Sequence, residues 1–585
     1  MDKLKLITSV VLILITVFAA FLPSLKCGFI NWDDYKYIVD NTAITSLSLT
    51  SLKTIFTSFF VVHYQPLTIL SYSFDYQYYK LNPFGYHLTN LILHIFNCLL
   101  VFYFIFLLSK NIGASLITTI FFGIHPLRVE SVVWISERKD VLYAFFYLSS
   151  MISYIYYLTK NNKLKYYFFS LFLFLCSLLS KSMAVTLPFV LLLLDYYLKR
   201  KPEKISFLNK VPYFCLSFIF SSIAILGSYL DNALRSESHY NFFSMLSVAC
   251  YDIVFYITKL LFPLRLSCLY PYYSSEFNLV YLYSIIAVIL LCVGLILSIR
   301  YTKKILFGGL FFVITLLPAL YVELIVADRY SYISSIGIFF ILASFLCWFY
   351  DKRRKLLVLL FVVVITTILS VITYNRSKVW HDGISLWSNA LSTNSNSAKI
   401  YNNRGVAYSD LGKHNEAILD YKKALEIDPY NADSYNNLGV SLLNKKEYSQ
   451  ALAEFNKTLR INPHYSQAYY YIAMIYGILD NHQEAIKFCK KTIQIDPNNA
   501  KAYALLCSAY GNIGNFTEAV QAGKKAIEFD SSFASAQYNL SVAYYFNKQY
   551  DLACIHLRLA MKLGWKPDPG FLKEIEKYCL INAKL

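Results

Sequence analysis

Two hydrophobic patterns divide the chain. From the N-terminus to about residue 375, long apolar runs alternate with short polar segments, whereas the remainder has the composition of an ordinary soluble protein. A membrane-spanning helix needs about 20 mainly apolar residues. The first region therefore predicts about eleven transmembrane helices, at 5–25, 86–108, 111–124, 141–159, 164–180, 184–198, 210–229, 277–299, 304–321, 331–350 and 355–374. We interpret the first as a retained helix, because no clear small-residue cleavage site follows it.

A period of 34 residues marks the second region. Prolines recur at this spacing at Pro429, Pro463 and Pro497. Small and aromatic or apolar residues recur at the same spacing, at Gly405, Gly439, Ala473, Cys507 and Ser541, at Ala417, Ala451, Ala485, Ala519 and Ala553, and at Tyr408, Leu442, Tyr476, Tyr510 and Tyr544. Small residues let two helices approach closely, and a proline ends the second helix of each pair. The pattern predicts five tetratricopeptide repeats, which stack into an α-solenoid.

The predicted fold class is thus all-α, with four segments. A polytopic transmembrane domain occupies 1–375, and a linker follows at 376–395. The repeats occupy 396–565, and a capping helix is expected at 566–585.

Composition agrees with a membrane protein and argues against nucleic-acid binding. Hydrophobic residues make up 57% of the 585 residues and charged residues only 15%, whereas soluble proteins have about 25% charged residues. The net charge is +18, but the Lys and Arg residues stand in short bursts between apolar runs. Such bursts are typical of cytoplasmic loops, which carry an excess of positive charge. The twelve cysteines show no paired spacing, so neither a zinc site nor a disulfide framework is predicted.

The charge bursts also predict an orientation. All of them fall in the cytoplasm if the apolar stretch 241–264 lies along the outer surface and does not cross, which Asp252, Lys259 and Pro263 favour. The outer side then receives residues 26–85, 125–140, 230–276, 322–330 and everything after about 375. The repeat domain is therefore expected to be extracytoplasmic, outside a bacterial inner membrane or in the lumen of the endoplasmic reticulum.

Charged residues gather in four segments at the outer ends of the predicted spans. The segments are WDDYKYIVDN, HPLRVESVVWISERKD, SKSMAVTLPF and ELIVADRYSY. Ionisable groups at membrane depth are costly and usually functional. The acidic pair Asp33 and Asp34 could supply a general base or help to hold a divalent cation. The basic groups could hold a phosphate. Supporting polar residues are expected at His125, Glu130, Glu137 and Asp328, with the two glutamates one heptad apart if 128–140 is helical. No metal-ligand cluster is predicted.

Asparagines mark one position of the repeats. Asn403, Asn437 and Asn539 share the repeat position that is expected to line the concave face, while Tyr471 and Leu505 interrupt the series. An amide both donates and accepts hydrogen bonds, so these residues are candidates for binding the backbone of an acceptor or partner polypeptide.

The order of these motifs, with LYPYY and WHDGISLW added, resembles the transmembrane and tetratricopeptide repeat-containing O-mannosyltransferases and their bacterial relatives, in the C-type glycosyltransferase superfamily. The resemblance covers nearly the whole chain. It implies a polyprenyl-phosphate sugar donor, often dolichyl-phosphate mannose, a protein Ser or Thr hydroxyl as acceptor, and inversion at the anomeric carbon. It also implies Asp33 as the catalytic acidic residue with Asp34 assisting, and Arg138, Lys181 and Arg329 as the groups that bind the donor phosphate.

Two other functions are compatible with the sequence. A non-catalytic membrane anchor could carry the repeats as a scaffold for an envelope or secretion complex. A transporter or flippase would favour charges at mid-membrane and inverted repeats, whereas the charges here stand mainly at the ends of the spans.

Overall fold

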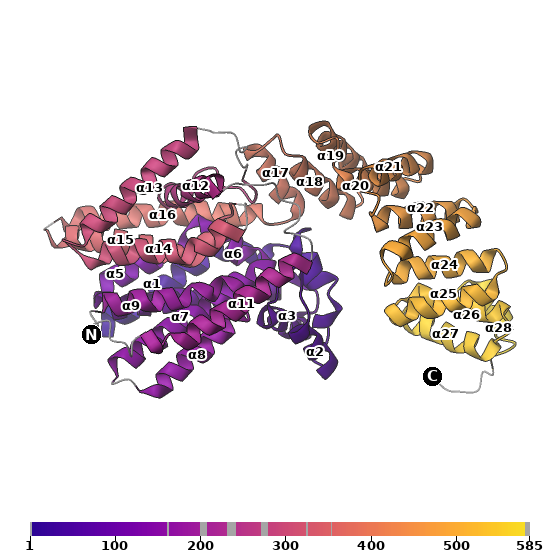
Figure 1. Cartoon of the computed structure of the whole chain (residues 1–585), viewed down its shortest axis with the longest axis horizontal. Helices are drawn as coiled ribbons and strands as arrows, with labels where there is room; N and C mark the ends of the chain where they lie inside the picture. The colour runs from indigo at the N-terminus through magenta and orange to yellow at the C-terminus, as the bar shows by residue number, and fades with distance from the viewer. Residues whose placement is uncertain are drawn as a thin grey trace. The chain divides into compact units, whose positions relative to one another are not determined.

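The computed structural model describes residues 3–160, 163–198, 207–230, 242–270, 279–322, 326–352 and 354–579 (Figure 1). The chain forms two compact units, the membrane unit Met1–Ser395 and the repeat unit Asn396–Leu585. Within the described ranges the regular elements are helical, and the single extended pairing is an isolated bridge between Phe60 and His63. Four predicted features lie wholly or partly outside the described residues. They are the basic burst at 199–204, Glu323, residues 231–241 and 271–278 of the predicted outer loop, and residues 580–585 of the predicted capping segment.

Each predicted transmembrane segment has a helix at its place. These helices are α1 (Lys3–Phe21), α4 (Pro83–Ser109), α5 (Ile112–Ile124), α7 (Arg138–Thr159), α8 (Leu164–Leu178), α9 (Leu187–Tyr197), α11 (Val211–Leu230), α13 (Leu279–Ser298), α14 (Lys303–Val322), α15 (Ser331–Asp351) and α16 (Lys355–Val379). The all-α prediction is confirmed.

Their lengths differ from the sequence expectation. In the described part of the chain, nine helices are long and apolar enough to cross a membrane, and α8 and α9 are shorter. Helix α5 is followed after a sharp bend of 57° by Pro126–Val133, so this pair is a broken span or a re-entrant segment. The nine include Phe243–Leu261 of α12 (Phe242–Leu261). Length and composition therefore also suit a crossing for α12, and its location along the outer surface stays a prediction.

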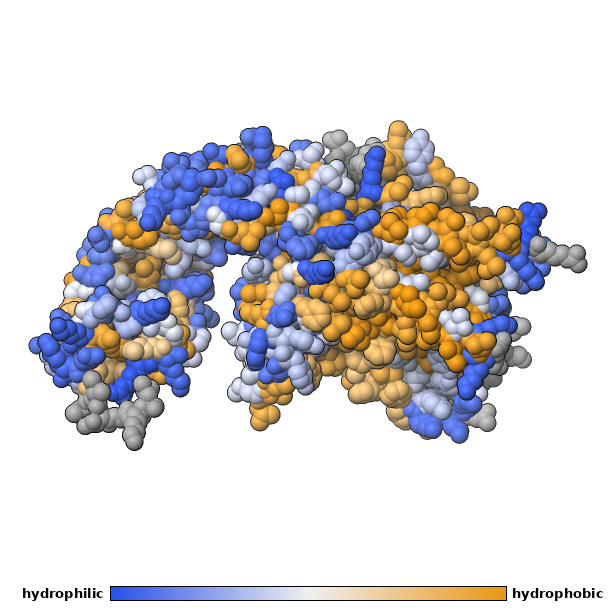
Figure 2. All heavy atoms as spheres, turned by 180° about the vertical axis from the view of Figure 1, so that it is seen from behind, coloured by the Kyte–Doolittle hydropathy of each residue, from blue (hydrophilic) through white to orange (hydrophobic). Residues whose placement is uncertain are grey.

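Helix α7 is the core of the membrane unit. The most apolar stretch of Ile135–Thr159 is 72% buried inside the protein, whereas the corresponding stretches of α13 and α16 are 6% and 17% buried. The exposed sides of α13 and α16 carry leucine, isoleucine and valine, and Figure 2 shows apolar residues covering a broad area of this unit. An apolar surface of this extent is expected where helices face lipid. The charged start of α7 is thus held inside the unit, while α13 and α16 form its outside.

The repeat unit consists of five helix pairs and a short final helix. The pairs are α18 (Ala398–Asp410) with α19 (His414–Ile427), α20 (Ala432–Asn444) with α21 (Tyr448–Ile461), α22 (Ser466–Ile478) with α23 (His482–Ile495), α24 (Ala500–Asn512) with α25 (Phe516–Phe529), and α26 (Ala534–Phe546) with α27 (Tyr550–Lys562), followed by α28 (Pro569–Ile575).

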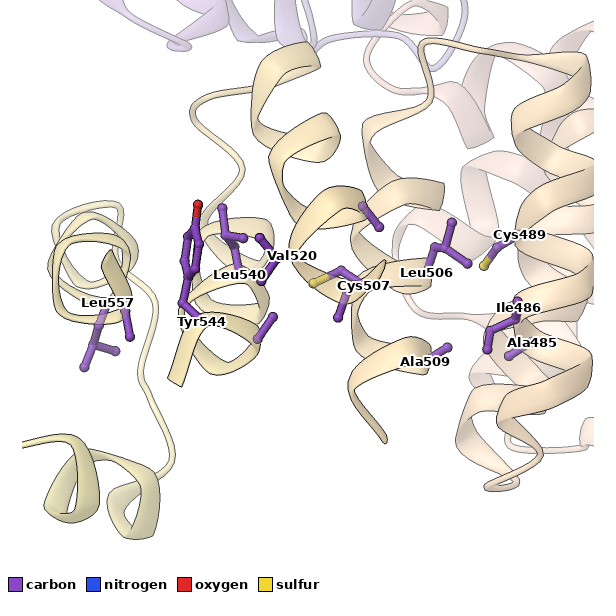
Figure 3. Close-up of a cluster of buried hydrophobic side chains, with 14 of the residues drawn as sticks. Ala485, Ile486, Cys489, Leu506, Cys507, Ala509, Val520, Leu540, Tyr544 and Leu557 are labelled. Atoms are coloured by element: carbon purple, nitrogen blue, oxygen red, sulfur yellow. The ribbon is translucent and has the colours of Figure 1, made fainter. Parts of the chain in front are cut away.

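Small residues have the predicted packing role. A methyl group on Gly405 would lie 2.6 Å from the ring of Tyr421, and one on Gly439 would lie 2.7 Å from the ring of Phe455. The five alanines of the repeat, from Ala417 to Ala553, are fully buried. Figure 3 shows the continuous apolar core that results between α23 and α27, where Cys507 and Leu540 lie among the labelled side chains. Ordinary repeat packing explains these positions.

The turn inside each repeat has a feature that the sequence analysis missed. The residues Gly412, Lys446, Asp480, Gly514 and Lys548 are each 34 positions apart and all have a positive φ, between 57° and 82°. Glycine adopts this conformation without steric cost, so the lysines and the aspartate are the exceptions. Because only two of the five are glycine, composition does not reveal the turn.

A disulfide closes the end of the repeat unit. Cys554 on α27 is bonded to Cys579 after α28, a separation of 25 residues. The prediction of no disulfide framework is wrong for this pair, because two cysteines 25 residues apart have no recognisable spacing. Tyr578, next to this bond, stacks on Tyr550 with ring centroids 4.0 Å apart. The last helix is thereby fixed to the final repeat.

We expect loss of this bond to destabilise the end of the repeat unit. Cys579→Ser in the full-length protein should lower the free energy of unfolding of the terminal repeat by about 2–4 kcal/mol, because the unfolded segment regains freedom. Limited proteolysis at α28 measures this. Cys215→Ser, which changes an exposed free thiol of the membrane unit, is the control. Equal protease resistance of Cys579→Ser and wild type, or alkylation of both thiols in unreduced protein, would contradict the bond.

The predicted linker at 376–395 is not extended chain. Helix α16 continues to Val379, and α17 (Gly383–Thr393) follows after three residues. Trp380 and Trp387 are almost fully buried in the membrane unit. The expectation of a linker failed because these two aromatic side chains pack against the membrane unit.

Candidate functional site

The acidic pair begins the loop that follows α1, and its two members have different surroundings. Asp34 is fully buried. Its carboxylate accepts hydrogen bonds from the backbone N–H of Ile30 at 2.9 Å, from the backbone N–H of Ser136 at 2.8 Å, and from the hydroxyl of Ser136. Burial raises the pKa of Asp34 to about 6, against the opposing effect of these hydrogen bonds. Asp34 thus joins the loop after α1 to the segment before α7.

Asp33 is left with an unpaired carboxylate. It is partly exposed, and it accepts no hydrogen bond and forms no ion pair within the described ranges. Burial raises the pKa of Asp33, Lys139 and Arg329 lower it, and Glu137 raises it further. Asp33 therefore faces charged groups without being neutralised by direct contact. A carboxylate in that state is available to accept a proton.

Six charged side chains lie together beside Asp33, and we call them the charge cluster: Glu130, Glu137, Lys139, Asp140, Lys181 and Arg329. The three cations among them surround Glu137. Glu137 Oε1 lies 3.1 Å from Lys139 Nζ and 3.5 Å from Arg329 Nε, and Glu137 Oε2 lies 3.5 Å from Lys181 Nζ. Lys181 Nζ also lies 2.6 Å from Asp140, and Arg329 Nη1 lies 2.6 Å from Glu130. Buried charges that pair in this way hold one another in fixed positions.

The cations of the cluster are mostly buried but are more exposed than the glutamate between them. The side chains of Lys139, Lys181 and Arg329 are 7%, 11% and 14% exposed, whereas Glu137 is 1% exposed. Aromatic rings support them: Lys139 Nζ lies 5.2 Å from the centre of the Tyr37 ring, and Arg329 lies 4.7 Å from that of Tyr330. The buried glutamate is thus surrounded by three cationic side chains, each of which keeps a small exposed fraction. An arrangement of this kind can bind an anion such as a phosphate.

The segment that supplies the glutamates is not one helix. A 3-10 turn at Pro126–Arg128, helix α6 (Val129–Val133) and a second 3-10 turn at Ile135–Glu137 follow one another, with extended backbone at Trp134. The heptad relation that a continuous helix would give Glu130 and Glu137 therefore does not apply. Both still reach Arg329, because the break turns the chain back toward it.

Arg138, a predicted phosphate-binding residue, has a structural role. It is fully buried. Its guanidinium forms an ion pair with Asp75 at 2.5 Å and donates to Asn90 Oδ1 at 2.7 Å and to the Tyr86 carbonyl at 2.8 Å. These contacts leave it no surface toward the charge cluster. Its neighbour Lys139 lies in the cluster instead, as the first two residues of α7 point in different directions.

His125 and Asp328 also lie outside the cluster. The His125 ring is fully buried, accepts from the backbone N–H of Leu127 at 3.3 Å, and contacts the Leu260 carbonyl at 3.2 Å. Asp328 Oδ1 accepts a hydrogen bond from the Tyr270 hydroxyl at 2.7 Å. Both hold α12 and the segment after it against the unit.

Tryptophans join the first loop to the segment that precedes the repeats. Trp32, next to Asp33, stacks on Trp134 at 4.5 Å and lies 5.0 Å from Trp387 of α17. Trp387 donates to Asn31 at 3.3 Å, and the Gly28 N–H donates to the His381 carbonyl at 2.9 Å. The motif WHDGISLW therefore forms one wall of the acidic loop. Trp134 and Trp387 are buried within this wall, and Trp32 is its partly exposed ring, next to Asp33.

The residues of the cluster do not fit a metal ion. Glu130, Glu137 and Asp140 are each paired with Lys or Arg, and the described residues hold no group of three or more His, Cys, Asp or Glu side chains arranged for a metal. Asp33, beside the cluster, has carboxylate oxygens that no hydrogen bond or ion pair engages within the described ranges. We derive no step through a divalent cation.

The predicted groove asparagines link successive repeats. Asn437 donates to Asn402 at 3.1 Å, and Asn539 donates to the carbonyl of Ala504 at 3.1 Å. Both bonds run back 35 positions, from the first helix of one repeat to that of the preceding one. Asn437 and Asn539 are half-buried, as is Asn403. One N–H of Asn437 and of Asn539 is thus engaged within the protein. Among the residues that the structure describes, these two amides make no other hydrogen bond, so a second N–H and the oxygen are open to a bound chain.

The fold and the site define a class, an integral membrane protein with a cluster of charged residues and a tetratricopeptide array. Tetratricopeptide repeat models match residues 398–431, 420–453, 466–499 and 500–533. The human protein O-mannosyl-transferase TMTC3 is 32% identical over 155 residues, 25% of this chain and 16% of that protein. A Caenorhabditis elegans protein O-mannosyl-transferase is 24% identical over 450 residues, 71% of this chain and 62% of that protein.

These matches confirm the predicted resemblance: the chain is similar to the protein O-mannosyl-transferases that combine transmembrane helices with tetratricopeptide repeats. The matched segments span about a sixth of the human relative. Among solved structures, YrrB, a tetratricopeptide repeat protein with an unusual peptide-binding site, is 24% identical; the match covers 33% of this chain and 97% of that one with a TM-score of 0.28. A MamA structure is also 24% identical, with a TM-score of 0.26 and coverage of 32% and 100%.

Proposed function

We propose that the chain transfers a sugar, in the simplest case mannose, from a polyprenyl-phosphate carrier to a Ser or Thr hydroxyl of a polypeptide. The observation that carries this proposal is the unpaired carboxylate of Asp33 beside three cations that share Glu137. A base and an anion site within one small region are what transfer from a phosphate leaving group requires.

Each group has a defined task in the proposed step. The acceptor hydroxyl oxygen attacks C1 of the sugar, and its proton passes to the Asp33 carboxylate. The bond between C1 and the phosphate oxygen breaks, and its electron pair leaves with the polyprenyl phosphate. The products are the glycosylated polypeptide, the lipid phosphate and protonated Asp33, which then loses its proton to water. Attack from the face opposite the phosphate inverts the anomeric carbon.

The cations act on the charge that develops during this step. A phosphodiester donor carries one negative charge, and the departing monoester phosphate gains a second. Lys139, Lys181 and Arg329 would stabilise this gain, since fixed charges in a site that excludes water need no reorganisation. Glu137 is a positioning residue, because it touches the cations and not the substrate.

The repeat unit would hold the acceptor polypeptide. Binding of an extended chain raises the local concentration of its hydroxyl groups near the membrane. The amide groups of Asn403, Asn437 and Asn539 are the candidates for gripping the acceptor backbone. The disulfide between Cys554 and Cys579 supports an extracytoplasmic position for this unit, because disulfides persist in oxidising compartments.

Mass spectrometry of secreted and envelope polypeptides tests the proposal. We expect peptides that carry a hexose on Ser or Thr in cells with the gene and not in cells without it, and the adduct mass and site would name sugar class and acceptor. Identical hexose occupancy in the two strains would refute the proposed transferase activity and favour the alternative in which the repeats act as a scaffold.

The pH dependence of transfer should report Asp33. The base must be ionised, so the rate should fall as pH drops through the pKa of Asp33, and burial places that pKa above the ordinary carboxyl value. Lys139 lowers this pKa, so Lys139→Gln should move the acid limb of kcat/KM to higher pH. A limb that does not move, or that moves to lower pH, would argue against Asp33 as the base.

A further inference from the structure

A strained turn beside the charge cluster carries a histidine that has no role so far. Phe60 and His63 exchange two backbone hydrogen bonds, of 2.9 and 3.0 Å, around Val61 and Val62. Both valines have positive φ, 46° and 71°. A tight two-residue turn demands this backbone, but β-branched residues rarely adopt it. Strain of this kind persists only where the surroundings impose it, and it concentrates at functional sites.

The surroundings that impose the turn are visible. A methyl group on Gly227 of α11 would lie 2.4 Å from the carbonyl oxygen of Val62 and 2.9 Å from the ring of Phe59. The glycine lets the backbone of α11 lie directly against the turn. The Tyr37 hydroxyl donates to the Phe60 carbonyl at 3.4 Å on the other side.

Both flanks of the turn are attached to elements that carry the cations. The Tyr37 ring that reaches Phe60 also lies 5.2 Å from Lys139 Nζ. On the other flank, the Leu67 N–H donates to the Leu179 carbonyl at 3.1 Å, and the Thr68 hydroxyl donates to the Ser180 carbonyl at 2.9 Å, directly before Lys181. The chain around His63 is therefore fixed against both lysines.

The His63 imidazole lies at the surface, and we expect it to be neutral at pH 7. His63 is surface-accessible, in contrast to the deeply buried His87, His94 and His125. Desolvation by the surrounding protein lowers the pKa of His63 to about 3, and the charges of Lys139, Lys181 and Arg329 lower this pKa further, while Glu137 raises it. A neutral imidazole donates one hydrogen bond and accepts another without adding charge. The cations of the cluster already have carboxylate partners. A neutral imidazole therefore complements them by adding a hydrogen-bond donor without adding a further charge.

We propose that His63 binds the phosphate of the lipid-linked donor directly, donating a hydrogen bond to an oxygen that Lys139 and Lys181 also face. The proposal rests on the proposed function for the identity of the donor. The turn fixes the backbone that carries the ring, so that this segment need not be ordered when the donor binds. His63 is then a substrate-binding residue at the edge of the cluster.

Binding of the lipid product is the direct test, because it does not need transfer. The probe is a short-chain polyprenyl phosphate added to the full-length protein in detergent, with the polyprenol of equal length as control. Affinity is read from the shift in unfolding temperature with ligand concentration. We expect His63→Ala to bind the phosphate about 10- to 100-fold more weakly, as a lost hydrogen bond to a charged group requires, and to bind the polyprenol unchanged. His63→Asn, which keeps an N–H donor, should recover part of the affinity.

Two further variants separate contact from folding. Val61→Asn with Val62→Gly should raise the unfolding temperature and keep phosphate binding, since this pair suits the turn. Gly227→Val should displace the turn and weaken binding as His63→Ala does. Equal phosphate affinity in His63→Ala and wild type would overturn the role of His63, and so would equal losses for phosphate and polyprenol. Wild-type protein that binds the phosphate through His63 but never transfers a sugar would refute the proposed function and not this inference.

Discussion

Asp33→Asn lowers sugar transfer by about 100-fold or more while the protein stays folded in the membrane. The size of the loss follows from removal of a general base, which contributes 10²- to 10⁴-fold. Folding should survive, because the Asp33 carboxylate makes no hydrogen bond or ion pair with any residue that the structure describes. Transfer to a peptide by isolated membranes, scaled to the amount of folded protein, measures the effect.

The neighbouring carboxylate supplies the contrast. Asp34→Ala leaves the N–H groups of Ile30 and Ser136 buried without a partner, at about 1–3 kcal/mol each. We therefore expect this variant to lose stability first, with less folded protein at a given temperature. Undiminished transfer by Asp33→Asn would remove Asp33 from the mechanism. Stability lost by Asp33→Asn and kept by Asp34→Ala would show that the two roles are reversed.

Arg138→Leu should be the most destabilising single change in the membrane unit. It leaves Asp75 as a buried charge without its cation and frees Asn90 and the Tyr86 carbonyl. Breaking a buried ion pair costs about 3–5 kcal/mol. We expect a large fall in unfolding temperature in detergent, and little folded protein to assay.

The adjacent lysine gives the matched control. Lys139→Gln removes one of three cations from Glu137, which keeps Lys181 and Arg329. It should therefore retain most of its stability while donor binding falls. If Arg138→Leu kept the wild-type unfolding temperature and instead bound the lipid phosphate more weakly, the original prediction of a phosphate-binding Arg138 would stand.

Arg138 and Lys139 also show which features of the site can be predicted from the sequence of this chain and which cannot. The segment was recognisable because charges at the end of an apolar run are costly. Which of two adjacent basic residues faces the site depends on where α7 begins and on partners such as Asp75, 63 positions earlier in the chain. His63 gave no signal at all, because its importance comes from the conformation of Val61 and Val62 and from Gly227 far along the chain.

The repeat unit was predicted far more completely. Its contacts are local, so that a spacing of 34 residues fixes which side chains meet, as Gly405 with Tyr421 and Gly439 with Phe455 illustrate. The pairing of Cys554 with Cys579 lies beyond the last full repeat, where the period ends and predicts nothing. Residues 376–395 were misjudged for a related reason, since the partners of Trp387 are Asn31 and Trp32 near the other end of the membrane unit.

Purified protein in lipid vesicles, given a labelled polyprenyl-phosphate mannose and a Ser/Thr-rich peptide, tests the central claim most directly. The account predicts that label appears in the peptide and is released as mannose by chemical cleavage of an O-glycoside. An equimolar amount of polyprenyl phosphate should form, and Asp33→Asn should transfer no label. Label that stays in the lipid with folded wild-type protein, across sugars and peptides drawn from its own cells, would contradict it.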